Sequence, residues 1–244
     1  MQFLSNLNLN NLINSALKLR DNLDNLKFVT EFEAVYNTLS YAFEPYKIYI
    51  ERFGLNKKRA LFMGMNPGPW GMAQTGVPFG EVNIVRDWLK INANVNKPLD
   101  EHVKYPVTGF SCKRSEVSGK RLWGLFKEIF IEPENFFENY FVINYCPLLF
   151  IKDGRNFTPD KLKVNERSEL YKLCDEHLLE CVKFFEPEFI VGIGNFAEAR
   201  ARAALQDFNS VKIIKILHPS PASPMSNKNW PEIALSTLQD AGVF

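Results

Sequence analysis

Residues 59–80, RALFMGMNPGPWGMAQTGVPFG, decide the fold. The apolar run after Arg59 has the length and composition of a buried parallel strand. A loop rich in glycine and proline follows; glycine permits close backbone approach, and proline fixes φ and removes a donor. Asn66 lies where the strand ends, and open α/β sheets bind ligands at the carboxyl ends of their strands. This stretch therefore predicts a parallel sheet with a binding site at its edge.

Later apolar runs predict further strands of the same sheet at residues 141–144, 189–193 and 211–217. Helical patterns lie around them, at residues 80–91, 122–130, 158–185, 196–205 and 229–241. We expect Ser118 or Ser115 to cap the 122–130 helix, and Thr158 to cap the helix that begins with Pro159. Alternating strands and helices predict the α/β class: three α/β/α layers around a central four-stranded, mostly parallel sheet.

The N-terminal part of the chain is expected to be helical. Residues 1–27 carry leucines at helical spacing, and residues 30–46 predict a second helix that closes near Pro45. Residues 1–52 would then cover the sheet. A chain of 244 residues fits one α/β domain, so we expect residues 1–244 to form a single domain.

Composition excludes several classes of function. A net charge of +1 attracts polyanions only through a local patch. No apolar run approaches the length of a membrane span, and the N-terminus lacks a signal-peptide core. We therefore expect a protein without a membrane partner that is cytoplasmic, in the bacterial cytosol or nucleoid, or nuclear if the source is eukaryotic. The cysteines at 112, 146, 174 and 181 form no C-x-x-C pair, which favours reduced structural thiols over metal ligands. Neither G-x-G-x-x-G nor a Walker lysine pattern occurs.

Three of the predicted strands end in a polar residue close to proline, namely Asn66, Asn144 and His218. In a parallel sheet these ends share one edge, so the three side chains can converge on one crevice. Each also has a structural alternative: His218 could be a satisfied structural histidine, and Asn144 could cap a turn. The prolines around His218 leave few backbone donors for its ring. Phe79 would by default be core, but its V-P-F-G context favours a fixed, accessible ring face.

A basic stretch at residues 113–121 combines lysines and arginines with serines. Such a run is usually a solvated surface. The hydroxyl groups among its charges also suit contacts to phosphate, so a local nucleic-acid patch is a second interpretation.

The motifs together resemble those of the single-strand-selective monofunctional uracil-DNA glycosylases, a branch of the uracil-DNA glycosylase superfamily. They are GMNPGPWGMAQTGVPFG at 64–80, NYCPL at 144–148 and HPSP at 218–221, supported by RSEVSG at 114–119 and NKxW at 227–230. The resemblance extends from about Arg59 to the C-terminus.

This resemblance implies a monofunctional DNA glycosylase of base excision repair. It would flip uracil out of DNA and hydrolyse its N-glycosidic bond, preferring single-stranded or mismatched sites. Xanthine, hypoxanthine and oxidised pyrimidines such as 5-hydroxymethyluracil are further candidate bases. Free uracil would be the product. No metal or organic cofactor is implied, and we expect a monomer that binds DNA.

The resemblance also implies residue roles. Asn66 would orient the attacking water, since an amide cannot act as a general base, and His218 would stabilise charge on the leaving uracil. Asn144 would read the Watson–Crick edge of uracil, and Phe79 would stack on the base. Further base-pocket positions are Gly68, Met72, Met65 and Pro67. Expected DNA contacts are Arg114, Ser115, Ser118, Lys120, Arg121, Ser220, Ala222 and Lys228.

Ala222 departs from the family pattern. Animal members carry an arginine after H-P-S-P that helps wedge the duplex open, whereas alanine can neither fill a vacated base position nor hold a phosphate. We therefore expect weaker duplex opening and a stronger preference for single strands or mismatches. The segment 222–229 is still expected to meet the DNA backbone through Lys228.

Two other functions remain open from the sequence. A non-catalytic nucleic-acid or nucleoside-binding protein could retain the same fold and pocket, but Asn66 and His218 favour an enzyme. A hydrolase using Cys146 or Cys112 is less favoured, because no G-x-S-x-G-like elbow surrounds either residue.

Overall fold

A central parallel sheet organises the protein, as a computed structural model that describes residues 2–208, 210–222 and 226–244 shows. The four-stranded sheet has the order β3-β2-β6-β7. Its strands are β3 (Tyr140–Asn144), β2 (Ala60–Gly64), β6 (Phe189–Ile193) and β7 (Lys212–Ile216). Every residue of β2 and β6 is buried, as strands covered on both faces require. The strands predicted from the sequence and the α/β class are confirmed.

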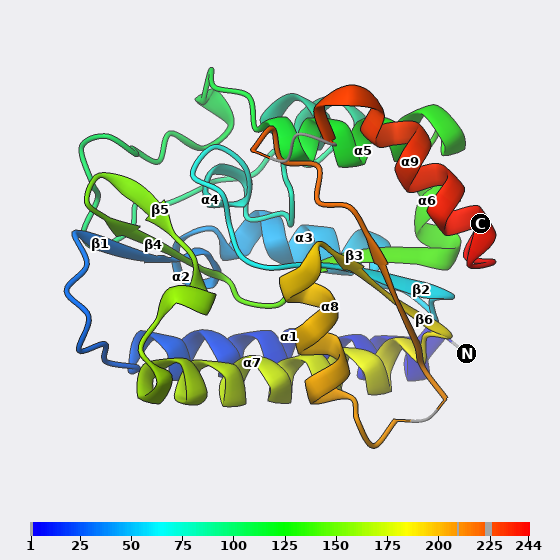
Figure 1. Ribbon diagram of the computed structural model, residues 1–244, viewed down its shortest axis with the longest axis horizontal. Helices are drawn as coiled ribbons and strands as arrows, with labels where there is room; N and C mark the ends of the chain where they lie inside the picture. The colour runs from blue at the N-terminus through cyan, green and yellow to red at the C-terminus, as the bar shows by residue number, and fades with distance from the viewer. Residues whose placement is uncertain (1, 209, 223–225) are drawn as a thin grey trace.

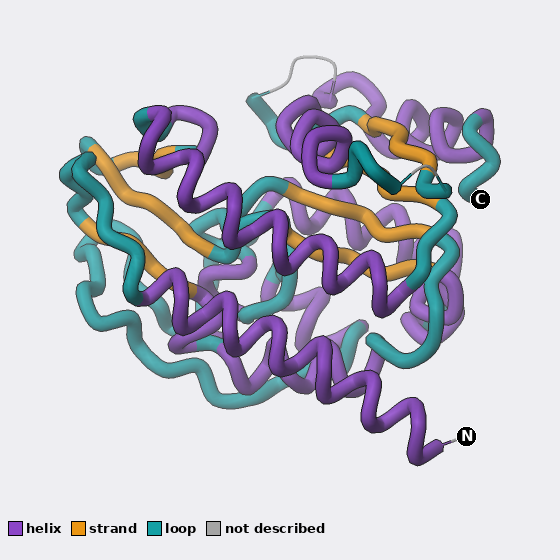
Figure 2. Tube along the Cα trace, turned by 90° about the horizontal axis from the view of Figure 1, so that it is seen from below, coloured by secondary structure: helices purple, strands orange, loops and turns teal. Residues whose placement is uncertain are grey.

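Helices cover both faces of this sheet, which gives the expected three layers (Figure 1). α1 (Gln2–Asp24) and α7 (Val164–Phe185) lie side by side on one face, and Figure 2 shows this pair in front of the strands. α8 (Asn195–Ala204) packs on β6 and β7. The opposite face carries α3 (Phe43–Phe53), α5 (Val117–Phe130), α6 (Pro133–Asn139) and α9 (Ser226–Asp240).

An aromatic core joins the sheet to α5 and α6. The Phe126 and Phe136 rings stack with centroids 4.3 Å apart, and Phe62 of β2 meets Phe126 edge-on at 4.9 Å. Trp123 is fully buried among these rings, and its Nε1 donates to the carbonyl oxygen of Pro78 at 3.1 Å. The core therefore also anchors the loop that follows β2.

A second, antiparallel sheet was not predicted from the sequence. It has the order β1-β4-β5, with β1 (Ala34–Asn37), β4 (Leu148–Lys152) and β5 (Arg155–Phe157). Asp153 and Gly154 join β4 to β5 with φ of 51° and 62°. This is the positive-φ pair that a two-residue hairpin turn needs, and Asp-Gly is its usual sequence.

The helix expected over residues 30–46 is wrong. Ala34 to Asn37 form a strand paired with β4, and the chain then forms the short α2 (Thr38–Tyr41) before α3 begins. Asn37 caps α2 by accepting a hydrogen bond from the backbone N–H of Leu39 at 3.2 Å. Tertiary pairing with β4 overrides the weak helical pattern here.

Other helix boundaries also differ from the predictions. Residues 80–91 contain a π-helix, η1 (Ile84–Trp88), instead of a long crossover helix. The α7 helix begins at Val164, after a separate 3-10 turn, η3 (Pro159–Lys161), which the Thr158 side chain does not cap. Glu116, and neither Ser115 nor Ser118, caps α5. Neither α6 nor another 3-10 turn, η2 (Gly109–Ser111), was predicted from the sequence.

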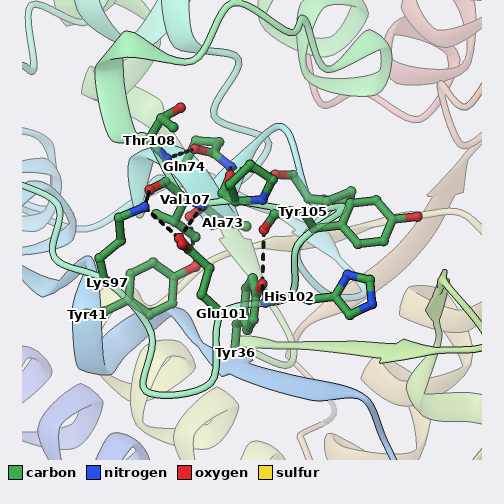
Figure 3. Close-up of polar contacts among 12 residues, drawn as sticks. Tyr36, Tyr41, Ala73, Gln74, Lys97, Glu101, His102, Tyr105, Val107 and Thr108 are labelled. Atoms are coloured by element: carbon green, nitrogen blue, oxygen red, sulfur yellow. Dashed lines mark hydrogen bonds and ion pairs between the residues drawn. The ribbon is translucent and has the colours of Figure 1, made fainter.

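Gln74 holds the loop after β2 in place through hydrogen bonds of its side-chain amide (Figure 3). It lies on the short α4 (Met72–Thr75) and is fully buried. Its Nε2 donates to the carbonyl oxygens of Pro69 at 2.9 Å and Pro106 at 3.0 Å, and its Oε1 accepts from the N–H of Thr108 at 2.9 Å. One amide thus ties the loop to residues 106–108.

We expect Gln74→Met to lower the free energy of unfolding by about 1–3 kcal/mol, because methionine fills the space but leaves these backbone groups unpaired. Urea denaturation measures the change. Gln239→Met, at an exposed position of α9, is the matched control and should stay within about 0.5 kcal/mol of the wild type. Equal stability of the two variants would refute the bracing role.

Candidate active site

A cavity of about 400 Å³ opens at the carboxyl edge of the parallel sheet. It brings together Asn66, Asn144 and His218, which follow or end three different strands. The complete lining is Met65, Asn66, Gly68, Pro69, Met72, Phe79, Glu116, Ser118, Asn144, Asn156, Thr158, His218 and Ser220.

The other predicted site residues lie outside this lining. Pro67 is buried. Arg121 is half-buried, and its guanidinium donates to the carbonyl oxygen of Pro219 and to Asn227 Oδ1, both at 3.0 Å. The remaining predicted DNA contacts are exposed: Arg114, Ser115, Lys120, Ala222 and Lys228. Residues 223–225 of the predicted 222–229 segment lie outside the described residues.

Asn66 is fixed with its oxygen available to the cavity. Its Nδ2 donates to the carbonyl oxygen of Leu148 at 3.1 Å. Because a carbonyl oxygen only accepts, the amide group must face it with its NH₂ end. The Oδ1 is therefore left as an acceptor for a molecule in the cavity.

Asn144 holds an unsatisfied oxygen. As the last residue of β3, it lies beside Gly64 of β2, and its Nδ2 donates to Met72 Sδ at 3.2 Å. Its Oδ1 is buried without a hydrogen-bond partner among the residues that the structure describes. A thioether is a weak acceptor, so both ends of this amide are under-used. Native proteins rarely bury such an atom without a reason, and a ligand donor is one.

Phe79 is held in an unusual backbone conformation. Its φ of 54° is left-handed, which costs an aromatic residue on the order of 1–3 kcal/mol. Its carbonyl oxygen accepts from the N–H of Glu81 at 2.8 Å and also packs so closely on Gly119 that a side-chain carbon there would overlap it. The ring lies with its centroid 6.1 Å from that of His218.

His218 is a neutral donor fixed by its surroundings. Its Nδ1 accepts from the N–H of Ser220 at 3.1 Å, so the neutral ring carries its hydrogen on Nε2. Burial lowers the pKa of His218 to about 4. Side chains also hold the local backbone: Trp230 donates to the carbonyl oxygen of Leu217 and Ser226 to that of His218, both at 2.6 Å.

Glu116, Asn156 and Thr158 also line the cavity and were missed. The Glu116 carboxylate accepts from the N–H groups of Ser118 and Gly119, and burial raises its pKa. Acidic side chains are favoured at helix N-termini, so Glu116 was a usable signal for the start of α5. Asn156 belongs to the unpredicted strand β5 and Thr158 follows it, so both were missed together with that strand.

The cysteines lie away from this cavity. Cys146, Cys174 and Cys181 are buried free thiols, and neither Cys146 nor Cys112 lines it. Within residues 2–208, 210–222 and 226–244, no group of three or more His, Cys, Asp or Glu residues is arranged to hold a metal ion. In the same ranges, no helix is long and apolar enough to cross a membrane.

The fold is that of a known class of protein. The family model of the uracil DNA glycosylase superfamily matches residues 52–240. A crystal structure of wild-type SMUG2 from Pedobacter heparinus has a similar fold, with a TM-score of 0.66 over 94% of this chain and 97% of that chain. At 14% sequence identity, this second likeness concerns the fold alone.

Two relatives are much closer in sequence. The single-strand selective monofunctional uracil-DNA glycosylase of Rattus norvegicus is 46% identical over 95% of this chain and 84% of its own length. The corresponding protein of Bos taurus is also 46% identical, over 95% of this chain and 86% of its own length. The chain therefore belongs to the single-strand-selective monofunctional branch of the uracil-DNA glycosylase superfamily.

We expect His218 to titrate near pH 4, well below its ordinary value of 6.5, because burial disfavours the imidazolium. Burial also lowers the pKa of His177 to about 4. The unfolded chain then takes up protons near pH 6.5 while the folded chain does not, so the free energy of unfolding falls as pH drops from 6.5 towards 4. NMR titration of the ring protons measures both values.

His218→Gln identifies the resonance of His218 and should remove one of the two low transitions. A His218 resonance that titrates at 6.5 would contradict the neutral, desolvated ring.

Proposed function

We propose that this protein is a monofunctional uracil-DNA glycosylase, which hydrolyses the N-glycosidic bond of uracil in DNA and leaves an abasic site. The observation that carries the proposal is the buried Oδ1 of Asn144, which has no hydrogen-bond partner in the described part of the chain and lies in a cavity shared with Asn66, Phe79 and His218. The activity named for the 46% identical relatives supports it.

Asn144 would select uracil by its hydrogen-bonding edge. Uracil offers a donor at N3 and an acceptor at O4, which match the Oδ1 and Nδ2 of an amide. An unpaired buried acceptor costs about 1–3 kcal/mol, and the N3–H of uracil would remove that cost. Cytosine presents the inverted pattern, with a lone pair at N3 that would face Oδ1. With cytosine bound, Asn144 Oδ1 would stay unpaired, and a buried group left unpaired discriminates strongly against the wrong base.

Phe79 would hold the flipped base. Extruding a base from a duplex costs a few kcal/mol, and less from a mismatch or a single strand. Stacking on an aromatic ring contributes on the order of 1–3 kcal/mol per base. Because the backbone of Phe79 is already held in its strained conformation, its ring would need no reordering when the base arrives.

Catalysis would depend chiefly on stabilising the negative charge of the leaving uracil. As the bond from C1′ to N1 breaks, the electron pair stays with uracil and negative charge develops at O2. The Nε2–H of neutral His218, aimed from a rigid backbone, would stabilise this charge in a dry site. Water then adds to C1′ and loses a proton to solvent. The Oδ1 of Asn66 would accept a hydrogen bond from this water and orient it.

Other aspects of the function are also proposals. Gly68 and Met72 line the cavity near the expected position of the base. Xanthine, hypoxanthine and 5-hydroxymethyluracil are further candidate substrates whose excision can be tested. The protein would act in the cytoplasm as a monomer, and it would release free uracil. The exposed cations Arg114, Lys120 and Lys228 suit contacts with the phosphates of DNA, the proposed partner.

One assay separates this function from a non-catalytic binding protein. Incubation with a uracil-containing single-stranded oligonucleotide in EDTA, followed by alkali, should break the strand at the uracil position. Without alkali the strand should stay intact, because the expected mechanism forms no Schiff base. Binding of the oligonucleotide without alkali-labile sites would instead support the non-catalytic alternative.

We expect Asn66→Ala to lower the single-turnover rate about a hundredfold or more, since the attacking water loses its fixed acceptor. Binding of uracil-containing DNA should survive, because Asn144 and Phe79 are untouched. Rapid-quench kinetics and fluorescence anisotropy measure the two quantities. Asn139→Ala, at an exposed position of α6, is the matched control. An unchanged rate in Asn66→Ala would remove Asn66 from the mechanism.

Ala222 should limit excision from duplex DNA. We expect the wild type to excise uracil faster from a single strand than from a U·A duplex, and Ala222→Arg to raise the duplex rate by supplying a long cationic wedge at this exposed position. Ala222→Gln controls for side-chain length without charge. Equal wild-type rates on the two substrates would overturn this expectation.

A further inference from the structure

A strip of rings and cations borders the cavity beside the β4–β5 hairpin. It consists of Trp70, Tyr105, Arg114 and Lys104, which we call the Trp70–Tyr105 strip. The Arg114 guanidinium lies 4.5 Å from the centroid of the Trp70 ring. The Trp70 and Tyr105 rings are 5.7 Å apart and tilted by 46°, and Lys104 Nζ lies 5.5 Å from the Tyr105 ring.

The strip is continuous with the cavity wall. Trp70 directly follows Pro69, and Arg114 comes just before Ser115 and Glu116; both Pro69 and Glu116 line the cavity. At the other end, Tyr105 Oη and Lys104 Nζ donate to the carbonyl oxygen of Gly154 at 2.9 Å and 2.6 Å, next to the strand that supplies Asn156. A nucleic-acid chain leaving the cavity on this side would therefore meet the strip first.

Its rings are mounted on rigid backbone. Gln74 holds the carbonyl oxygen of Pro69, and Tyr36 Oη donates to that of Tyr105 at 2.9 Å. Figure 3 shows the Tyr105 ring directed away from the polar contacts around Gln74 and Glu101. Both Trp70 and Tyr105 are half-buried, while Arg114 and Lys104 are exposed. The rings thus keep part of their surface accessible.

An ordinary surface pair in the same protein provides a contrast. Arg20 lies 5.8 Å from the Phe43 ring, but it also pairs with Asp21 at 2.7 Å, and neither residue lines the cavity. For Arg114 and Lys104, no carboxylate partner lies within 4.0 Å in the described ranges. Their charge remains available to an anion beside accessible rings.

From this geometry we infer that the Trp70–Tyr105 strip is a stacking subsite for an unpaired nucleotide next to the flipped uracil in single-stranded DNA. The inference rests on the proposed function and deepens it. Aromatic rings stack on any base, and cations beside them neutralise backbone phosphates. In a duplex the neighbouring base is already paired and stacked within the helix. The strip therefore favours single strands by attraction, independently of Ala222.

The experiment compares single-stranded oligonucleotides with one uracil, in which the 5′ or 3′ neighbour is either a nucleotide or an abasic tetrahydrofuran spacer. For the wild type, a spacer on the stacking side should lower kcat/KM about 5- to 150-fold, the range for one lost stack. Trp70→Ala should show a similar loss on the complete oligonucleotide and no further loss with the spacer. Trp70→Phe should recover part of the loss.

Two controls separate stacking from general damage. Excision from a U·G duplex should change little in Trp70→Ala, and Phe43→Ala should leave all substrates unchanged. Tyr105→Leu is a second variant should Trp70→Ala fold poorly. Equal losses in Trp70→Ala on single-stranded, spacer and duplex substrates would overturn the subsite, as would no loss at all.

Anisotropy with the same oligonucleotides measures their binding even where no uracil is excised. Loss of the spacer effect in Trp70→Ala would support the subsite by this measure alone. Failure of the proposed function and failure of the subsite are therefore distinguishable.

Discussion

The missing side chain at Gly64 is the constraint on which the cavity depends. Gly64 ends β2 beside Asn144 of β3, and a side-chain carbon there would overlap both Asn144 Oδ1 and the Phe79 ring. The amide that would read the base and the ring that would stack on it can approach each other only over bare backbone. Gly119 on α5 plays a similar part, because the absence of a side chain there lets the Phe79 carbonyl oxygen pack against the helix. The glycines thus set the shape of the site.

Several unfavourable features gather around this constraint. Phe79 has a strained φ, and among the described residues Asn144 Oδ1 has no hydrogen-bond partner; each of these two features costs the free protein on the order of 1–3 kcal/mol. Burial also opposes the charged forms of His218 and Glu116. The aromatic core around Trp123 and the Gln74 brace offset these costs from outside the cavity. The protein therefore holds groups whose hydrogen-bonding capacity a bound base would satisfy.

The sequence predicted the parallel sheet and the convergence of Asn66, Asn144 and His218 because buried parallel strands are short apolar runs and their ends share one edge. It failed for β1, β4 and β5, since the antiparallel pairing of β1 with β4 joins residues 34–37 to residues 148–151, far apart in the chain. The Asp153–Gly154 dipeptide was the one sequence signal that indicated the β4–β5 hairpin. Asn156 and Thr158 were missed for this reason, since they reach the cavity only through the second sheet.

That second sheet changes how selectivity for single strands should be understood. Selectivity is a difference between two binding free energies. It can therefore arise from weak binding of duplex DNA or from strong binding of single-stranded DNA. Ala222 would weaken the response to duplex, because alanine offers nothing to an opened duplex. The Trp70–Tyr105 strip would strengthen the binding of single strands, because only an unpaired neighbour can reach it. Lys104 and Tyr105 are tied to Gly154 of the β4–β5 turn, so the hairpin that supplies Asn156 to the cavity also supports the strip. One wall of the cavity and the strip beside it are therefore held by the same hairpin.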